Sequence, residues 1–152
     1  WIMKAIGVKM VDIMPMSVSM ALEHGYRVGN ANPNDMGYEV TYPDGYKSWC
    51  PKDVADASYF CLSPENDGTK ILEQDVDNFI AAKRGNRIGN KTTLMSLLTI
   101  TGYECHGLSA CVDANNYNRE IGEKFALEKA KDAIWNGLGF VLQWAKDGLK
   151  RT

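Results

Sequence analysis

The amino-acid sequence predicts an α+β protein in which small antiparallel β hairpins pack with helices, and one long helix lies near the C-terminus. Alternating apolar and polar residues flank a turn sequence near residue 43 and again near residue 101. After residue 113 the apolar residues follow helical spacing. We expect an N-terminal Tyr-rich hairpin/helix module at 1–61, a linker and connecting helix at 62–90, and a C-terminal hairpin plus long helix module at 91–152.

The first elements are a strand and a short helix. An alternating apolar pattern predicts a strand over 3–14, which Pro15 should end. Ser17 is a good N-cap for a helix over 18–24, and Gly25 is a typical residue after a helix end.

The first hairpin has the clearest local signals of this module. Tyrosines and a valine alternate with polar residues over 38–42, and a Pro-Asp-Gly turn at 43–45 leads into a return strand at 46–50. Pro51 suits the first turn of a helix over 52–60.

The middle of the chain is predicted to connect two modules. Residues 62–70 are rich in turn formers and form the linker. Apolar residues at roughly helical spacing predict a helix near 70–83, followed by a short basic loop at 83–87 that could attract an anion.

The C-terminal module begins with the second hairpin, which has a β-rich strand at 92–100, a Thr-Gly turn and a return strand at 103–112. Asp113 should cap a helix that runs to about residue 135, with glycines at 137 and 139 ending it. The last apolar segment, 140–144, fits a strand or a short helix. The apolar side of the long helix is predicted to comprise Tyr117, Ile121, Phe125, Ala130, Ile134 and Leu138.

Small residues recur every fourth position on this helix, at Gly122, Ala126 and Ala130. Glycine costs about 1 kcal/mol against alanine inside a helix, so a close packing contact is expected there. The contacting backbone could belong to the hairpin or to a second subunit, and we expect a dimer or higher oligomer.

Residues typical of catalysis and metal binding are sparse. The four cysteines, Cys50, Cys61, Cys105 and Cys111, contain no C-x-x-C pair and are expected to be free thiols without a metal. Of the two histidines, His24 lies at a predicted helix end, and His106 shares a strand face with Glu104. The Glu104/His106 pair is the one local arrangement that would suit a hydrolase. No motif that binds a dinucleotide cofactor or a nucleoside triphosphate is present, so we expect no cofactor and no catalytic residues.

The charge excludes some partners. The net charge of −2 argues against general nucleic-acid binding, and no apolar stretch approaches the roughly 20 residues that span a bilayer. Residues 1–80 hold 6 Lys/Arg and 12 Asp/Glu, whereas residues 81–152 hold 11 and 7. The acidic first half would suit a basic surface on a host protein.

Two segments resemble proteins of tailed phages. The segment GYEVTYPDGYKSWCPK at 37–52 is similar to an N-terminal hairpin module with the signature D-G-Y-x-S-W-x-P-K. Residues 90–142 resemble a widespread family of small tailed-phage accessory proteins. The chain departs from that family at Ala114, where proline is common, and at Leu138, where an acidic residue is common. The shared elements include Lys91-Thr92-Thr93, Gly102-Tyr103, Ser109-Ala110-Cys111-Val112, Asn116-Tyr117, Ile121-Gly122-x-Lys124 and Gly139-Phe140.

The resemblance implies a phage accessory protein that acts in the host cytoplasm and blunts host defence. The N-terminal module is similar to one joined to phage proteins that sequester nucleotide immune signals. We therefore expect a non-enzymatic protein that binds a cyclic nucleotide or related signal. The alternatives are a protein–protein inhibitor that docks onto a host defence protein, and an oligomeric structural or regulatory phage protein.

Candidate ligand-binding residues follow from chemical type and position near turns. Aromatic rings can stack on a base, and cationic side chains can bind phosphates. Alternatively, Tyr46 and Trp49 could simply cover the sheet, and Arg119 could be solvated. The candidates are Tyr46, Trp49, Tyr103 and Tyr117 for a base, Arg87, Lys91 and Arg119 for phosphates, and Ser109 as a hydroxyl ligand.

Overall fold

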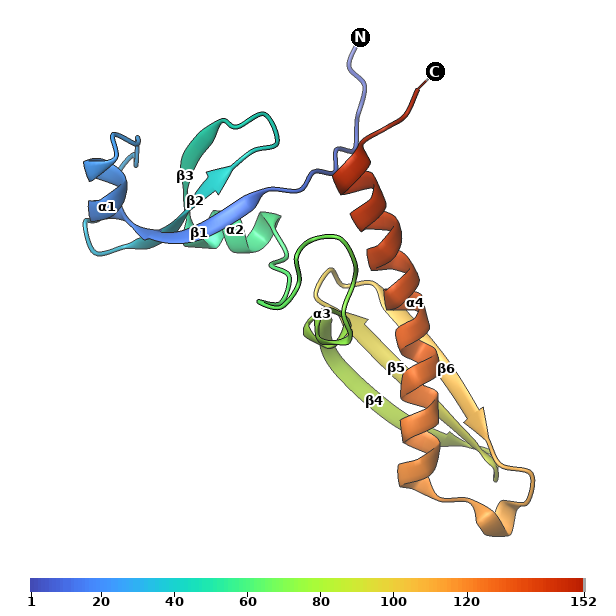
Figure 1. Ribbon diagram of the computed structural model, residues 1–152. Helices are drawn as coiled ribbons and strands as arrows, with labels where there is room; N and C mark the ends of the chain where they lie inside the picture. The colour runs from blue at the N-terminus through green and yellow to red at the C-terminus, as the bar shows by residue number, and fades with distance from the viewer. Residues whose placement is uncertain (152) are drawn as a thin grey trace. The chain divides into compact units, whose positions relative to one another are not determined.

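The computed structural model describes residues 1–151 and confirms the α+β class. The described chain divides into two compact units, one formed by residues 1–61 with 144–151 and the other by residues 62–143. Each unit holds one three-stranded antiparallel sheet, with strand order β1-β2-β3 in the first and β4-β5-β6 in the second (Figure 1).

The sheet of the first unit consists of β1 (Asp12–Ser17), β2 (Met36–Thr41) and β3 (Lys47–Pro51). The β2–β3 hairpin and its turn lie where the sequence predicted them, and Gly45 N donates to Tyr42 O at 2.9 Å. The prediction of a strand over 3–14 ending at Pro15 is wrong. The strand begins at Asp12 and continues through Pro15, which pairs with Tyr38. Proline is tolerated there because β1 is an edge strand, so its missing N–H removes no interior ladder bond.

Two short helices accompany this sheet, α1 (Val18–Glu23) and α2 (Lys52–Ser58). Ser17 caps α1 as predicted, its hydroxyl accepting from Met20 N at 3.2 Å. Pro51 occupies the position just before α2, again close to expectation. The core between α1 and the sheet consists of Met16, Val18, Ala21 and Trp49.

The second unit begins with a loop that is fixed by one buried carboxylate. Asp75, which is fully buried, lies in α3 (Glu73–Asn78) and accepts from Ser63 N at 2.7 Å, Leu72 N at 2.9 Å and Asn66 Nδ2 at 2.6 Å. Burial alone would raise the pKa of Asp75, but these hydrogen bonds outweigh it and lower the pKa below the usual range. The loop over 62–72 is therefore held in one conformation.

The helix predicted near 70–83 is present but shorter, and the predicted basic loop at 83–87 is wrong. Helix α3 ends at Asn78, and residues 80–88 form the edge strand β4 (Ile80–Ile88). This strand pairs along its length with β5 (Thr92–Thr99), with Arg84 opposite Ser96 and Arg87 opposite Thr93. Ladder pairing with a strongly β-forming neighbour overrides the helical spacing in the sequence.

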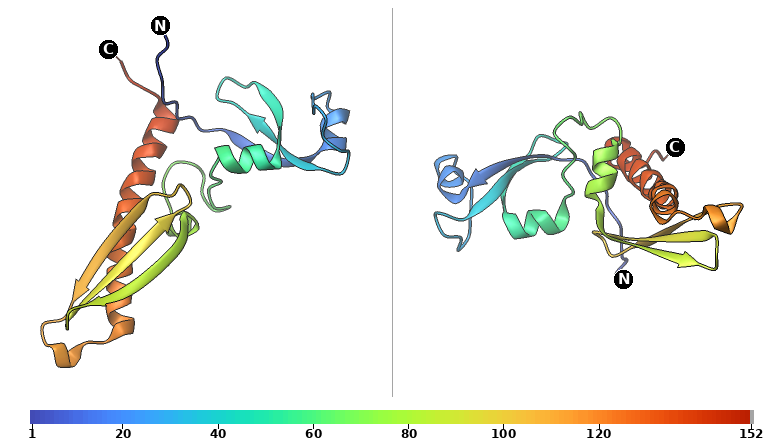
Figure 2. Two further views of the ribbon diagram at one scale, coloured as in Figure 1. Left: turned by 180° about the vertical axis from the view of Figure 1, so that it is seen from behind. Right: turned by 90° about the horizontal axis from the view of Figure 1, so that it is seen from below.

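The hairpin of β5 and β6 (Glu104–Ala110) confirms the second hairpin prediction, and Gly102 N donates to Thr99 O at 2.9 Å in its turn. Alternate residues of β5 are buried on the side that faces the long helix α4 (Arg119–Asp147) (Figure 2). These buried residues are Thr93, Met95, Leu97 and Thr99.

Helix α4 differs from its prediction at both ends. Asp113 caps a short 3-10 turn, η1 (Ala114–Asn116), and the α-helix starts only at Arg119. It then runs unbroken past Gly137 and Gly139, so the segment 140–144 is helical. The buried side was predicted in part. Ala130, Ile134 and Leu138 are buried as expected, together with Ala126 and Lys131, whereas Ile121 and Phe125 remain about half exposed and Tyr117 lies outside the helix.

The stripe of small residues on α4 packs against the sheet of its own unit. A Cβ atom on Gly107 of β6 would overlap the backbone at Ala126 and Ala130, and one on Gly122 would overlap the Thr93 hydroxyl. Of the two partners that the sequence left open, the hairpin accounts for the stripe. The stripe therefore gives no support for an oligomer, and the expected dimer or higher oligomer stays a prediction.

An ion cluster joins α3 to α4. The Lys131 side chain is only 4% exposed, and its ammonium lies 2.8 Å from Asp77 Oδ1, 3.3 Å from Glu73 Oε1 and 3.8 Å from Glu128 Oε1. Burial opposes the charged form, but the three carboxylates outweigh it and raise the pKa of Lys131. Separately, none of the helices within residues 1–151 combines the length and apolarity required to cross a membrane.

Candidate ligand-binding cavity

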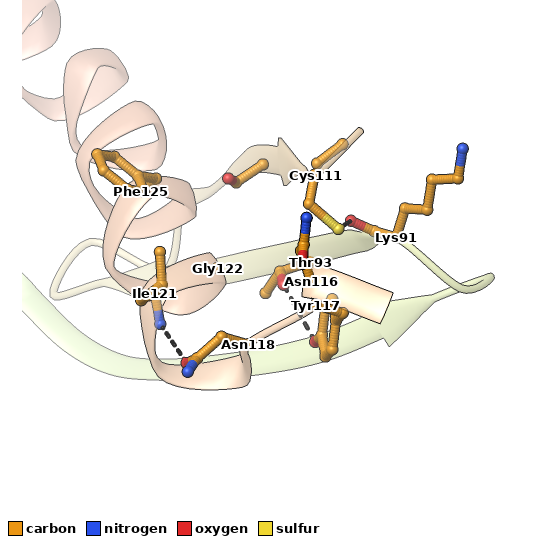
Figure 3. A pocket seen from close by; sticks show the side chains of 11 residues that line it. Lys91, Thr93, Cys111, Asn116, Tyr117, Asn118, Ile121, Gly122 and Phe125 are labelled. Atoms are coloured by element: carbon orange, nitrogen blue, oxygen red, sulfur yellow. Dashed lines mark hydrogen bonds between the residues drawn. The ribbon is translucent and has the colours of Figure 1, made fainter. Parts of the chain in front are cut away.

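A cavity of about 170 Å³ lies where the start of α4 meets the β5–β6 hairpin (Figure 3). Its wall combines polar side chains from the strand ends and the η1 segment with apolar side chains from the first turns of α4. The residues that line it are Lys91, Thr93, Ser109, Ala110, Cys111, Asn116, Tyr117, Asn118, Ile121, Gly122 and Phe125.

Two side-chain caps shape the connection between β6 and α4. Asp113 Oδ1 accepts from Asn115 N at 2.9 Å, and Asn118 Oδ1 accepts from Ile121 N at 3.1 Å. Asp and Asn are preferred at such positions because their short side chains reach the free N–H groups at the start of a helix. The two caps hold residues 114–118 beside the start of β5, and this segment forms one wall of the cavity.

The Cys111 side chain is engaged by the backbone. Its Sγ lies 3.2 Å from Asp113 O and 3.6 Å from Lys91 O, so its single proton can be donated to either carbonyl, and Cys111 N donates to Lys91 O at 3.0 Å. The thiol proton is thus directed at carbonyl oxygens, which favours a structural role for this cysteine. The Lys91 backbone is fixed by the same contacts while its side chain extends from the rim (Figure 3).

Tyr117 is held in place from two directions. Its hydroxyl lies 3.2 Å from Thr93 Oγ1, and the Arg87 guanidinium carbon lies 3.9 Å from the centroid of its ring. Arg87 Nη2 in turn donates to Asn90 O at 2.6 Å. Arg87 therefore supports Tyr117 from outside the cavity lining, and the tyrosine ring is an ordered part of the wall.

The unpaired polar groups of the lining are one cation and two groups that can both donate and accept hydrogen bonds. Within the described residues, the side chains of Lys91, Ser109 and Asn116 have no polar partner, and no acidic residue lines the cavity. The first turn of α4 adds the positive end of a helix dipole. The cavity can therefore accept a small anionic or acceptor-rich group beside an aromatic ring.

The structure brings together three of the eight candidate site residues, Lys91, Ser109 and Tyr117, and places Arg87 behind Tyr117. Arg119 lies nearby but outside the lining, and its exposed guanidinium pairs with Glu123 at 2.9 Å. The analysis of the sequence missed Asn118. Its position three residues before Ile121, at the start of the apolar helical pattern, is the signal that could have identified it as a cap.

The other three candidates are not among the residues that line this cavity. Trp49 is 8% exposed and donates its indole N–H to Met16 O at 2.9 Å, so it is a core residue and the prediction that it stacks on a ligand is corrected. Tyr46 is exposed at the first hairpin turn and stacks on Tyr42, with 5.8 Å between ring centroids. Tyr103 is exposed at the β5–β6 turn, the far end of that hairpin from the cavity.

The tyrosines of the first unit interact with one another. Burial, followed by the hydrogen bond with Tyr42, raises the pKa of Tyr59 to about 12. Hydrogen bonds from Ser48 and Tyr59 lower the pKa of Tyr42, and the Lys9 ammonium lies 4.6 Å from the Tyr42 ring centroid. The phenol oxygen of Tyr42 is thus already an acceptor within the protein.

No clustered metal ligands occur within residues 1–151, where His, Cys, Asp and Glu side chains nowhere gather in groups of three or more suited to an ion. Cys50, Cys61, Cys105 and Cys111 are all free thiols.

Most of the second unit lies within a segment that matches a known protein family. Residues 71–145 match the model of the Phage protein (N4 Gp49/phage Sf6 gene 66) family. The matched segment runs from α3 through the β4–β6 sheet and nearly to the end of α4, and it includes every residue that lines the cavity. Residues 71–145 are therefore similar to this phage protein family.

The remaining comparisons add no relative. Neither curated proteins nor solved structures include a match to the chain. The family match leaves residues 1–70 uncovered, so the resemblance of 37–52 to a phage hairpin module stays a prediction.

Proposed function

We propose that the chain is a non-enzymatic phage accessory protein that acts in the host cytoplasm and counters host defence by sequestering a nucleotide-type immune signal. The observation that carries the proposal is the composition of the cavity. An anchored aromatic ring, a lysine and two carboxamides surround one concave site, and no acidic residue lines it. The phage family of residues 71–145 supports the phage setting of the proposal.

Each part of a nucleotide has a chemical counterpart in the lining. The Lys91 ammonium can reach a phosphate at the rim, and the Ser109 hydroxyl and the Asn116 carboxamide offer further donors. The Tyr117 ring offers a surface for a base, and asparagine side chains are well suited to the polar edge of a base. Sequestration requires only binding, so the proposal assigns no bond-breaking step to any residue.

A bound-ligand assay tests the proposal. Purified protein is mixed with cyclic di- and trinucleotides and ADP-ribose derivatives, washed by filtration and heated, and the released compounds are separated by chromatography. We expect one nucleotide to be recovered intact. Lys91→Ala should retain much less of it, whereas Lys124→Ala, which removes an exposed lysine of α4 outside the lining, should retain the wild-type amount. Recovery of a cleaved product would contradict a binding role.

A second candidate function is docking onto a host protein. It is favoured by the first unit, where Met14, Met20, Leu22 and Met36 are each between 44% and 54% exposed. Flexible methionine side chains are common on surfaces that bind other proteins. If no nucleotide is retained across the panel, this second function becomes the preferred one.

A further inference from the structure

We infer that the cavity holds only the base of a nucleotide, so that the protein selects its ligand by the base and tolerates different phosphate linkages. This inference rests on the proposed function and specifies which part of the ligand is recognised. The volume is the first argument. Pockets that enclose a whole small-molecule ligand usually measure about 300–1,000 Å³, whereas this cavity measures about 170 Å³. Part of a nucleotide therefore remains outside.

The distribution of charge decides which part stays outside. Among the lining residues Lys91 is the one cation, and its exposed side chain extends from the rim (Figure 3). The other lining side chains are neutral. A phosphate enclosed by neutral groups would lose its hydration without gaining an opposite charge, which is strongly unfavourable. The phosphate therefore stays at the rim, in water and close to Lys91.

The neutral part of the lining has the chemistry that a base requires. It presents two aromatic rings, those of Tyr117 and Phe125, with the apolar side chain of Ile121 and the carboxamide of Asn116. Bases stack on aromatic rings, and a carboxamide can both donate to and accept from the edge of a base. The Tyr117 ring is already held by Arg87 in the free protein, so binding a base costs little further ordering of this ring.

Ligand specificity follows from this orientation. A nucleoside, its monophosphate and a cyclic dinucleotide of the same base present the same group to the cavity. Their phosphates differ, but these meet one exposed ammonium, and contacts between exposed charges are weak. We therefore expect the dissociation constants of ligands with one kind of base to agree within tenfold. A change of base should alter the affinity by more than tenfold, because it changes the hydrogen bonds at the base edge.

Titration calorimetry at constant salt concentration tests the inference. The ligands are adenosine, guanosine, cytidine and uridine, their 5′-monophosphates, their 3′,5′-cyclic monophosphates, and the four cyclic dinucleotides that each carry a single kind of base. We expect the same base to bind most tightly in all four chemical forms.

Two pairs of variants separate recognition of the base from recognition of the phosphate. Lys91→Ala should reduce the affinity for the monophosphate to that for the nucleoside and leave nucleoside binding unchanged. Lys124→Ala, which removes an exposed lysine outside the lining, should change neither. Asn116→Ala should weaken both ligands by the same factor, about threefold or more, because both lose a contact with the base. Asn115→Ala, the neighbouring asparagine outside the lining, should bind like wild type.

The outcomes separate the inference from the proposed function. If a nucleotide binds but its nucleoside binds more than tenfold more weakly, the phosphate is recognised, and the inference is overturned while sequestration stands. Equal affinities for all four bases, or an equal loss of nucleoside and monophosphate in Lys91→Ala, would also overturn it. If no member of the panel binds, the proposed function and the inference fail together.

Discussion

The aromatic side chains of the two sheets have different roles. In the first unit, Trp49 packs in the core and bonds to Met16, and Tyr46 stacks on Tyr42, so these rings contact other parts of the same unit. In the second unit, Tyr117 is anchored by Thr93 and Arg87 yet lines a cavity. An aromatic residue beside a turn is thus weak evidence for a binding site, and the environment of its ring decides the matter.

Removing the core tryptophan should have the largest effect. Trp49→Ala empties a space between α1 and the sheet of the first unit and leaves Met16 O without its donor. We expect a loss of about 3–5 kcal/mol in the free energy of unfolding, measured by urea denaturation. The control Tyr46→Ala removes an exposed ring and should stay within about 0.5 kcal/mol of wild type. Similar losses for the two variants would contradict the core role of Trp49.

The close packing of α4 on its sheet can be broken at one position. Gly107→Val places side-chain atoms where the backbone at Ala126 and Ala130 lies, so helix and strand must move apart. We expect a loss of about 3 kcal/mol, seen as a lower melting temperature in calorimetry. Gly139→Ala, at an open position of the same helix, should raise stability by as much as about 1 kcal/mol. An unchanged melting temperature for Gly107→Val would contradict the close contact of Gly107 with the backbone at Ala126 and Ala130.

The fixed loop of the second unit depends on the charge of Asp75. Asp75→Asn keeps the shape but weakens three hydrogen bonds, and should cost about 2 kcal/mol at neutral pH. Because the folded state lowers the pKa of Asp75, its contribution is complete above the ordinary aspartate pKa and is lost as pH falls through the lowered value. The stability difference between wild type and variant should therefore shrink below about pH 4. A difference that grows in acid would contradict this assignment.

The ion cluster of Lys131 should contribute less, because its three carboxylates are partly exposed. Lys131→Met retains most of the apolar stem and should cost about 1–2 kcal/mol. The raised pKa of Lys131 means that its contribution is complete below the ordinary lysine pKa and falls as pH rises through the raised value. Thermal unfolding of both proteins from pH 7 to pH 11 checks this. A stability difference between wild type and variant that increases with pH would contradict the stabilising role of the charged Lys131.

The smallest effect is expected behind the cavity. Arg87→Ala frees one face of Tyr117 and removes the bond to Asn90 O, and should cost about 1 kcal/mol. Nucleotide affinity should fall only severalfold, because Arg87 positions the ring without lining the cavity. Calorimetry of binding and of unfolding on one preparation measures both. A complete loss of binding with unchanged stability would instead make Arg87 a direct ligand contact.

Local signals in the sequence predicted much of the fold. The cap at Ser17, both hairpin turns and the helix after Pro51 follow from residues that act on their immediate neighbours. Strand β4 could not be found in this way, because its polar edge sequence becomes a strand only by pairing with β5. The continuity of α4 through Gly137 and Gly139 likewise depends on burial of Ile134 and Leu138 in the fold.

The candidate site was predictable in part. Lys91, Ser109 and Tyr117 have the right chemistry and lie close to turns that the sequence defines. The cavity itself depends on the caps of Asp113 and Asn118, which start α4 five residues later than the sequence suggests. Trp49 shows the opposite error, since nothing in its local sequence shows that its N–H is used inside the core.

The central claim is that the second unit binds a nucleotide through Tyr117 while the tyrosines of the first unit do not. The most direct test compares Tyr117→Ala with Tyr46→Ala by titration calorimetry, using the nucleotide panel. Loss of stacking on a base is worth about 1–3 kcal/mol, so Tyr117→Ala should bind roughly ten- to a hundredfold more weakly, and Tyr46→Ala should match wild type. Unchanged binding in folded Tyr117→Ala, with loss in Tyr46→Ala, would contradict the claim and move the site to the first unit.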